Sequence, residues 1–295
     1  MSSDVAGGAS PPRAREVDLE RQVTSLGQAV DELRRLARDT QDRLQSVEAE
    51  LRGLQGSGSG SHDVGGWGPR FAAIYADFTE HFRGSTAEVS AKLEGYLPDV
   101  HRIVGPGGVV DLGCGRGEWL ALLRVAGVVA RGVDANAAFV AAGRARGLDM
   151  ELGDALRYLQ ALPADSLDMV TAFHVLEHLT TEDLLALLEA AHRVLRPGGC
   201  LLLETPNPRN LVMAACDFYN DPTHRSPLPP ALTEYLVSTH GFGDVEVRPL
   251  HPAATPPELP AGQHAGAPVQ DLVERALFGP QDYAVLGYKL PAEGA

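Results

Sequence analysis

Three glycines alternate with other residues in one short stretch, and their spacing is the strongest chemical signal in the chain. The stretch runs from Val109 to Trp119 and reads VVDLGCGRGEW, with its glycines at Gly113, Gly115 and Gly117. A strand, a tight turn and a helix N-terminus in this order bring bare backbone N–H groups close to a nucleotide-like ligand. An ordinary glycine turn between a strand and a helix is the simpler alternative.

Two common phosphate-binding motifs do not fit this stretch. A dinucleotide fingerprint of the GxGxxG type needs glycine where the chain has Glu118, and a carboxylate there would repel a pyrophosphate. The P-loop motif also fails, because no Gly-Lys-Ser/Thr follows. A second acidic residue, Asp134, ends the next predicted strand, where its side chain can accept both hydrogen bonds from a ribose diol.

Two histidines and a carboxylate lie close together in the segment His174–His178, which reads HVLEH. His174 and His178 stand at i and i+4 with Glu177 between them, but the order does not reproduce the HExxH zinc motif. The sequence offers no further ligand set, so we expect no metal site.

A polar segment after the fifth predicted strand carries residues that could bind a substrate and accept a proton from it. It includes the residues FYNDPTHR at 218–225. His224 titrates near neutral pH, Asp221 lies three residues before it and can orient it, and Tyr219 offers an aromatic wall. The alternative is structural, with Asp221-Pro222 as a turn and His224 as a helix cap.

Together these motifs resemble the class I S-adenosylmethionine (SAM) dependent methyltransferases. The residues from Asp111 match their D-x-G-x-G-x-G motif, and RPGG at 196–199 before a predicted strand is a further mark of the family. FRGS at 82–85 and DPTHRSP at 221–227 resemble a bacterial group that is often fused to coiled coils or found with glycan-assembly enzymes. The resemblance covers about residues 70–291.

The resemblance implies a set of cofactor contacts: Arg83, Asp111, Gly113, Cys114, Gly115, Asp134, Ala135, Asp154, Ala155 and His174. Arg83 would meet the SAM carboxylate, although a surface arginine facing a helix C-terminus is an equal alternative. Asp154 would face the adenine amino group, with Ala155 supplying a backbone N–H, or Asp154 would simply cap the next helix. His174 would line the adenosine pocket.

The implied reaction is an in-line displacement in which an acceptor oxygen attacks the sulfonium methyl group. We expect a hydroxyl of a sugar, glycan or other small molecule as acceptor, His178 or His224 as base, and Asp221 as its partner. Two alternatives remain open: a coiled-coil scaffold that binds SAM without turnover, and a NAD-dependent oxidoreductase.

The elements that position these residues alternate between strand and helix. The pattern predicts a doubly wound, seven-stranded α/β sheet. The resemblance implies the Rossmann-like methyltransferase order, with the last strand antiparallel and inserted near one edge. The fourth predicted strand covers 166–172, and Asp168 is expected at its solvent end. The RPGG segment is expected to have a structural role. Predicted strands lie near 109, 128–133, 149–152, 166–172, 200–204, 245–250 and 283–290, and predicted helices at 71–82, 86–96, 118–125, 137–146, 155–159, 181–195, 229–239 and 269–278. The proline-rich segment 251–268 between the last two strands is a candidate lid.

Four parts are expected along the chain: a disordered tail at 1–15, a coiled-coil helix at 16–55, a flexible linker at 56–66 and a methyltransferase domain at 67–295. The coiled-coil seam has Val23, Val30, Ala37, Leu44 and Leu51 at its a positions. This pattern favours two parallel helices and therefore a homo-oligomer. A lone amphipathic helix folded onto the domain is the alternative.

Composition narrows the classes of partner. The formal net charge of -14 argues against a nucleic-acid partner, because phosphate binding needs a basic surface. The three cysteines show no metal spacing, as is usual in a reducing compartment. We find no signal peptide pattern and no apolar run of the length that spans a bilayer, so we expect a soluble, cytoplasmic protein.

Overall fold

The computed structural model of the chain describes residues 74–75, 78–79, 81–252 and 267–291. All of them lie in one compact unit, Asp63–Ala295. The predicted tail, coiled coil and linker, and residues 253–266 of the candidate lid, lie outside the described residues. Within these described ranges, no helix is both long and apolar enough to cross a membrane.

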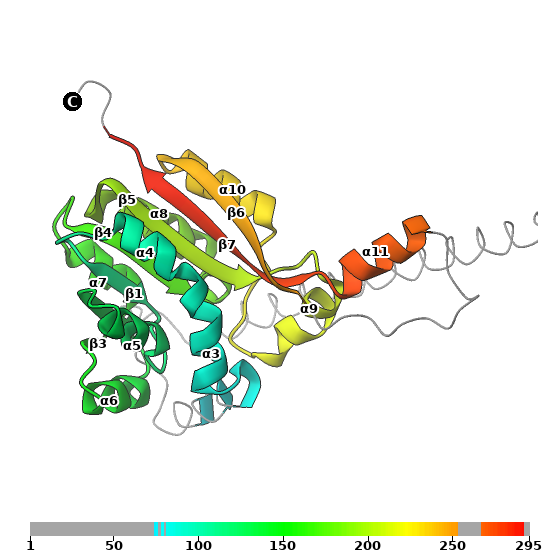
Figure 1. Ribbon diagram of the computed structural model, residues 1–295, viewed down its shortest axis with the longest axis horizontal. Helices are drawn as coiled ribbons and strands as arrows, with labels where there is room; N and C mark the ends of the chain where they lie inside the picture. Colours follow the sequence, from blue (N-terminus) through cyan, green and yellow to red (C-terminus); the bar gives the residue numbers. More distant parts are fainter. Residues whose placement is uncertain (1–73, 76–77, 80, 253–266, 292–295) are drawn as a thin grey trace, which may run out of the picture. The chain divides into compact units, whose positions relative to one another are not determined.

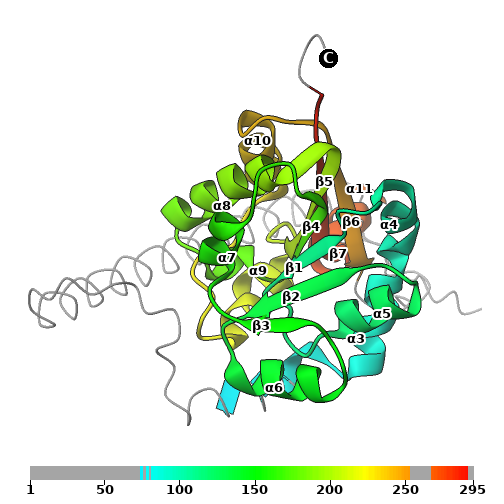
Figure 2. The same cartoon turned by 90° about the vertical axis from the view of Figure 1, so that its left-hand side faces the viewer.

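One mixed sheet of seven strands organises the described part of the chain, in the order β3-β2-β1-β4-β5-β7-β6 (Figures 1 and 2). Strands β1 to β5 run parallel to one another, and β7 runs antiparallel to both β5 and β6. The strands are β1 (Val109–Leu112), β2 (Ala130–Asp134), β3 (Met150–Leu152), β4 (Leu167–Phe173), β5 (Leu195–Pro206), β6 (Phe242–Pro252) and β7 (Pro280–Lys289). The predicted doubly wound sheet and its inserted antiparallel strand are confirmed.

Helices cover both faces of this sheet, with α4 and α5 on one side and α7 and α8 on the other (Figure 2). The α-helices are α3 (Thr86–Leu93), α4 (Leu97–Ile103), α5 (Glu118–Val125), α6 (Ala137–Ala145), α7 (Ala155–Ala161), α8 (Thr181–Val194), α9 (Leu211–Ala215), α10 (Pro230–Thr239) and α11 (Ala267–Leu277). Three short 3-10 helices are η1 (Glu94–Tyr96), η2 (Leu176–His178) and η3 (Asp217–Asn220).

The central strand β4 shows how one sequence serves both layers. Its side chains alternate between faces, as the period of a strand requires. Val170 and Ala172 pack in the apolar cluster that includes α7 and α8, and Met169 and Phe173 pack in the cluster that includes α3, α4 and α5. Both sides of β4 are therefore buried, which holds its carboxyl end in place for the residues that follow.

The position of Asp168, at the amino-terminal end of β4, differs from the prediction. Asp168 is not at a solvent end, because its side chain is fully buried. Its Oδ2 accepts hydrogen bonds from Gly105 N and Gly108 N at 2.8 Å each, and its Oδ1 pairs with the Arg196 guanidinium. Burial by itself would raise the pKa of Asp168, but Arg196 and the two N–H groups hold it below its usual value. A carboxylate with this many partners is stable inside the protein.

The RPGG segment serves the fold, as predicted, and it lies within β5 rather than before it. Leu195 already pairs with Leu167, and the register then shifts before Cys200 pairs with Met169. Gly198 has φ of 79°, which favours glycine. The chain therefore bulges at RPGG and returns to the same strand.

The leading helices follow the predicted start but run further. Ser85 caps α3, and the Glu88 side chain reaches back to the Ser85 backbone N–H, which completes a capping box. The predicted end near Tyr96 is the short helix η1, after which α4 begins with Pro98 in its first turn. Proline is tolerated at that position, so the helical path restarts there instead of ending.

Candidate functional site

A small hollow that opens to solvent lies beside the glycine loop. Its lining comes from the leading helices, the loop, the start of α5 and the end of β4. The lining residues are Thr79, Arg83, Val89, Leu93, Asp111, Gly113, Cys114, Arg116, Glu118, Trp119 and Phe173. Four predicted cofactor contacts, Arg83, Asp111, Gly113 and Cys114, therefore come together on one surface.

The glycine loop has a shape that other residues cannot copy. Gly113, Gly115 and Gly117 have φ of 61°, 52° and 79°. A Cβ on Gly113 would lie 2.6 Å from a methyl carbon of Val175, and a Cβ on Gly117 would lie 2.7 Å from one of Leu148. Bare backbone is therefore required here, as the motif predicts.

The wall of the hollow carries groups of both signs. The buried Asp111 accepts a hydrogen bond from Thr171 Oγ1 at 2.7 Å, and burial raises its pKa to about 7. Arg83 also lines the hollow, and its Nη2 donates to the Phe173 carbonyl at 2.9 Å. Trp119 Nε1 is a buried donor with no acceptor among the described residues. A carboxylate, a guanidinium and an open N–H suit a ligand that carries both an ammonium and a carboxylate.

Asp134 closes β2 next to this loop. Its Oδ2 accepts from Gly115 N at 2.7 Å, and its Oδ1 accepts from Asn136 N at 2.7 Å. Burial raises the pKa of Asp134, and the two N–H groups oppose that shift. Each carboxylate oxygen keeps a further lone pair that can accept from a diol. Ala135 follows at an exposed position.

Cys114 is buried within the same loop. Its N–H donates to the Val133 carbonyl at 3.1 Å, which ties the loop to β2. Burial raises the pKa of its thiol. The side chain is therefore a neutral, apolar part of the wall, and its backbone carries any polar role.

Asp154 caps helix α7, as the structural alternative predicts. Its Oδ1 accepts from Arg157 N at 2.8 Å, and Ala155 is the first residue of the helix. The proposed contacts of Asp154 and Ala155 with adenine stay predictions.

His174 lies just beyond β4, and its ring faces acidic side chains. Its Nδ1 is 3.3 Å from Glu177 Oε1, and its Nε2 is 3.4 Å from Glu204 Oε1 and 3.9 Å from Asp282 Oδ1. Burial alone would lower the pKa of His174, but the neighbouring carboxylates of Glu177 and Glu204 raise it to about 10. His174 is not among the residues that line the hollow, and its backbone φ of 56° is unusual for histidine.

A hydrogen-bonded chain links two of the predicted catalytic residues. Thr223 Oγ1 donates to Asp221 Oδ1 at 2.6 Å and lies 2.9 Å from His178 Nδ1. Because the Thr223 proton is given to Asp221, its oxygen is free to accept from Nδ1–H of His178. Nε2 of His178 is then the unprotonated nitrogen, and burial lowers the pKa of this histidine.

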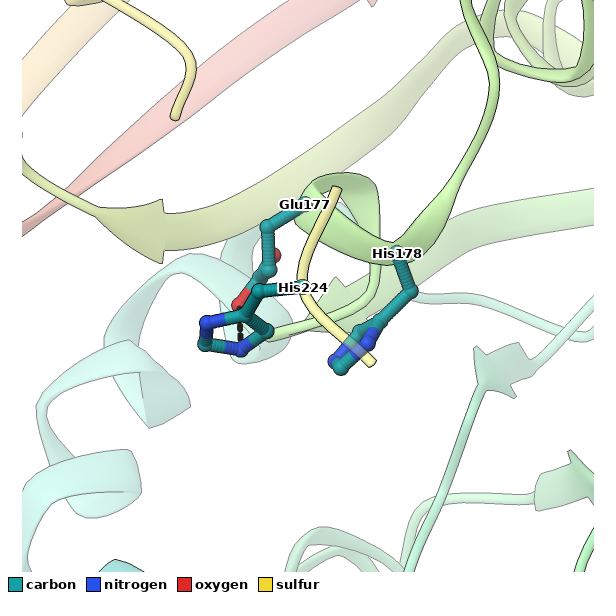
Figure 3. Close-up of side chains that lie close together, drawn as sticks. All are labelled: Glu177, His178 and His224. Atoms are coloured by element: carbon teal, nitrogen blue, oxygen red, sulfur yellow. Dashed lines mark ion pairs between the residues drawn. The ribbon is translucent and has the colours of Figure 1, made fainter. Parts of the chain in front are cut away.

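His224 lies beside His178, with the ring centroids 4.7 Å apart. Its Nδ1 is 2.6 Å from the Phe218 carbonyl, so Nδ1 carries a proton and donates it there. Its Nε2 lies 3.8 Å from Glu177 Oε1 and 3.9 Å from Asp221 Oδ2. Figure 3 shows Glu177 and His178 projecting from one short helix while His224 approaches from a separate segment.

Glu177 is the central residue that sequence reasoning did not assign to the site. It is fully buried, and its Oε2 accepts from Thr205 Oγ1 at 2.9 Å. Burial would raise the pKa of Glu177, but His174 and the neighbouring histidines lower it to about 2. Its place between His174 and His178 in HVLEH could have indicated that Glu177 belongs to the site. Asp282, within β7, offered no such signal.

The acceptor segment differs from the predicted long polar loop. It contains α9 and η3, and Asn210 caps α9 by accepting from Val212 N and Met213 N. The Asn210 amide also donates to the Gly279 carbonyl at 2.9 Å, which ties the segment to the start of β7. Tyr219, the predicted aromatic wall, is largely exposed.

Comparison with known proteins identifies similarity to methyltransferases. A family model described as a methyltransferase domain matches residues 85–246. A protein of Mycolicibacterium smegmatis named as an S-adenosylmethionine-dependent methyltransferase is 33% identical over 177 residues, which are 60% of this chain and 67% of that protein. A relative from Mycobacterium tuberculosis with the same description is 31% identical, and the match spans 58% of this chain and 61% of the relative.

A solved structure agrees with these matches. The crystal structure of a SAM-dependent methyltransferase from Archaeoglobus fulgidus has 32% sequence identity and a TM-score of 0.66, and it covers 73% of this chain and 99% of that one. The matched family model spans the glycine loop, Asp134 and His178. The chain therefore belongs to the methyltransferase-domain family and is an enzyme that uses S-adenosyl-L-methionine.

Proposed function

We propose that this methyltransferase methylates a hydroxyl group of a sugar, a glycan or another small molecule. The observation that carries the proposal is the chain from His178 through Thr223 to Asp221, with contacts of 2.9 and 2.6 Å. It leaves an unprotonated nitrogen on a histidine whose pKa is lowered by burial. Because a sugar hydroxyl has a high pKa, a base of this kind is useful for its methylation.

The cofactor side, defined as the hollow together with Asp134, is proposed to bind S-adenosyl-L-methionine. Asp111 and Arg83 would hold the ammonium and the carboxylate, and Asp134 would accept from the ribose hydroxyls. The buried Trp119 N–H without an acceptor supports this fit, since an amino acid carboxylate can accept from it. When bound, S-adenosyl-L-methionine supplies an activated methyl group. The loop backbone from Gly113 to Gly115 gives the ligand room.

Other predicted contacts belong to the same proposal. Cys114 and Ala135 would contribute backbone, Asp154 and Ala155 would meet the adenine, and His174 would lie next to the adenosine. Asp154 can serve both as helix cap and as adenine contact, because its second oxygen has no hydrogen bond among the described residues.

On the acceptor side, defined as Glu177, His178, Asp221, Thr223 and His224, we assign proton removal to Nε2 of His178. The proton on Nδ1 is donated to Thr223, and the positive charge that develops on the ring is stabilised by the Asp221 carboxylate. This arrangement fixes the ring and its tautomer before the acceptor arrives.

His224 is the second candidate base, and the geometry supports a different task for it. Its Nδ1–H is given to the Phe218 carbonyl, and its Nε2 faces the carboxylates of Glu177 and Asp221. The His224 ring lies between the carboxylates of the fully buried Glu177 and the partly buried Asp221. We therefore propose that His224 orients these two carboxylates, and that His178 accepts the proton.

The N-terminal part is proposed to form a coiled coil over residues 16–55 that joins two copies of the chain. The seam of apolar a and d positions supports this proposal. The low number of cysteines and the net charge support a cytoplasmic enzyme without a nucleic-acid partner.

Calorimetric titration with S-adenosyl-L-methionine and with NAD, followed by assays for released S-adenosylhomocysteine, tests the function. We expect binding of S-adenosyl-L-methionine alone, and turnover with a sugar acceptor in preference to lipid and phenol acceptors. Binding without turnover on any acceptor would favour a scaffold role. Binding of NAD would favour an oxidoreductase.

A further inference from the structure

Two histidines and two carboxylates meet where β4, β5 and β6 end and β7 begins. His174 follows β4, Glu204 belongs to β5, Asp282 to β7 and His251 to β6. His251 Nδ1 lies 3.0 Å from Asp282 Oδ2 and 4.0 Å from Glu204 Oε1. One donor atom each from His174, Glu204 and Asp282 lies within 4.8 Å of the other two. We propose that this set, called the strand-end cluster, binds a divalent metal ion.

The spacing of the donor atoms suits a metal. Bonds of about 2.1 Å from a metal to nitrogen and oxygen place neighbouring ligands roughly 3 to 3.5 Å apart. His174 Nε2 lies 3.4 Å from Glu204 Oε1 and 3.9 Å from Asp282 Oδ1. Small side-chain rotations would bring these atoms around one ion. Two imidazoles with two carboxylates suit Mn²⁺, Fe²⁺ or Zn²⁺ better than Mg²⁺ or Ca²⁺, which prefer oxygen alone.

The residues that contact the proposed ligands give independent support for a bound metal. A metal-bound histidine usually donates its other ring N–H to a carboxylate, which fixes the ring. Glu177 Oε1 lies 3.3 Å from His174 Nδ1, and this fully buried oxygen has no hydrogen-bond partner among the described residues. A metal on Nε2 of His174 would fix the Nδ1–H proton that Glu177 can accept. Glu204 is oriented in the same way by the Tyr96 hydroxyl on its Oε2.

The charge at the cluster also favours a cation. Glu177, Glu204 and Asp282 are 0%, 3% and 5% exposed. A histidine binds a metal through its neutral imidazole, so the Glu204 and Asp282 carboxylates supply the two negative charges that a divalent ion balances. Buried charge of one sign is costly, and a divalent ion would neutralise it.

The proposal departs from the sequence-based expectation of no metal. The four ligands come from four separate segments, so no local motif announces them. A second group of metal-type donors among the described residues is Glu177, His178 and His224. Its two histidines are assigned above to proton transfer and to orienting the acceptor-side carboxylates, and the experiment separates the two groups.

The test uses the full-length chain after treatment with a chelator. Titration with Mn²⁺ and with Zn²⁺ by calorimetry is expected to show one saturable site per chain. Asp282→Asn and Glu204→Gln should each weaken the affinity at least about tenfold. The matched control is Asp149→Asn, an exposed carboxylate on the far side of the sheet order, and it should leave metal affinity unchanged.

Two results would overturn the proposal: no saturable binding of either metal, or binding that is lost in His178→Asn and kept in Asp282→Asn. Affinity for S-adenosyl-L-methionine and the melting temperature check that each variant is folded. If these variants do not fold, the electron paramagnetic resonance spectrum of bound Mn²⁺ is compared between the unaltered chain and His178→Asn, and coupling to histidine nitrogen must be present in both. The measurement needs no acceptor, so its failure leaves the proposed methyl transfer untouched, and the reverse also holds.

Discussion

The cofactor side and the acceptor side lie at the same carboxyl edge of the sheet but are built differently. On the cofactor side, Asp111 and the glycine loop are contiguous in sequence, and Asp134 follows one crossover later. Much of the specificity there comes from backbone, because a Cβ on Gly113 would clash with Val175. On the acceptor side, His178 and Asp221 are far apart in sequence and are linked through the Thr223 side chain.

The difference indicates how each side can vary. A backbone cradle accepts one class of ligand and tolerates few substitutions at its glycines. The side chains of His178 and Thr223 lie outside the strands, on η2 and on the segment after η3, so changing them should disturb the sheet little. The acceptor is therefore the more variable part of such an enzyme.

Replacing the proposed base should have the largest effect and should affect one side only. In His178→Asn, kcat is expected to fall about 10²- to 10⁴-fold because no group accepts the acceptor proton. Affinity for S-adenosyl-L-methionine, measured by calorimetry, should stay the same. Thr223→Val, which removes only the link to Asp221, should cause a smaller loss. An equal loss of cofactor affinity in His178→Asn would show that the two sides are not separate.

The corresponding change on the cofactor side is Asp134→Ala. Hydrogen bonds to a charged group contribute about 1.5–3 kcal/mol each, so losing those to a ribose should weaken cofactor binding at least about 100-fold. The control is Thr180→Ala, which removes the helix cap of α8. It should cost about 1 kcal/mol in the free energy of unfolding and change cofactor affinity much less. Unchanged affinity in Asp134→Ala would contradict the ribose assignment.

The two sides should also respond differently to pH. The pKa of Asp111 is about 7, so its carboxyl is neutral below that pH and ionised above it. Affinity for S-adenosyl-L-methionine should therefore rise with pH through about 7, and Asp111→Asn should remove this dependence. With the cofactor saturating, kcat should fall only on the acidic side of 6.5, because the pKa of His178 is lowered and a protonated ring cannot accept a proton. A change in kcat with pH above pH 6.5 would indicate another base.

Removing residues 1–60 should have the smallest effect on either side. Sedimentation is expected to show a change from dimer to monomer, because the coiled-coil seam is lost. Cofactor affinity and kcat should stay within about twofold, since the residues assigned to both sides lie beyond position 74. An unaltered sedimentation mass would contradict the coiled-coil prediction.

The sequence by itself determined the sheet and the glycine loop, because both depend on local patterns. Alternating helical and strand periods imply the layered fold, and only glycine fits the positive φ of the loop. The role of Asp154 as a helix cap is similarly local. The resemblance to a family added what no pattern states, namely the antiparallel insertion of the last strand.

Tertiary structure alone decided where buried polar groups find their partners. Asp168 was expected near solvent, yet Arg196 and two backbone N–H groups meet it inside the protein. His174 was expected beside the adenosine, and its ring faces Glu204 and Asp282. Such pairings join strands that are neighbours in the sheet but distant in the chain, and a buried charge is stable only if those distant partners arrive. No local periodicity in the sequence predicts which distant residues will pair.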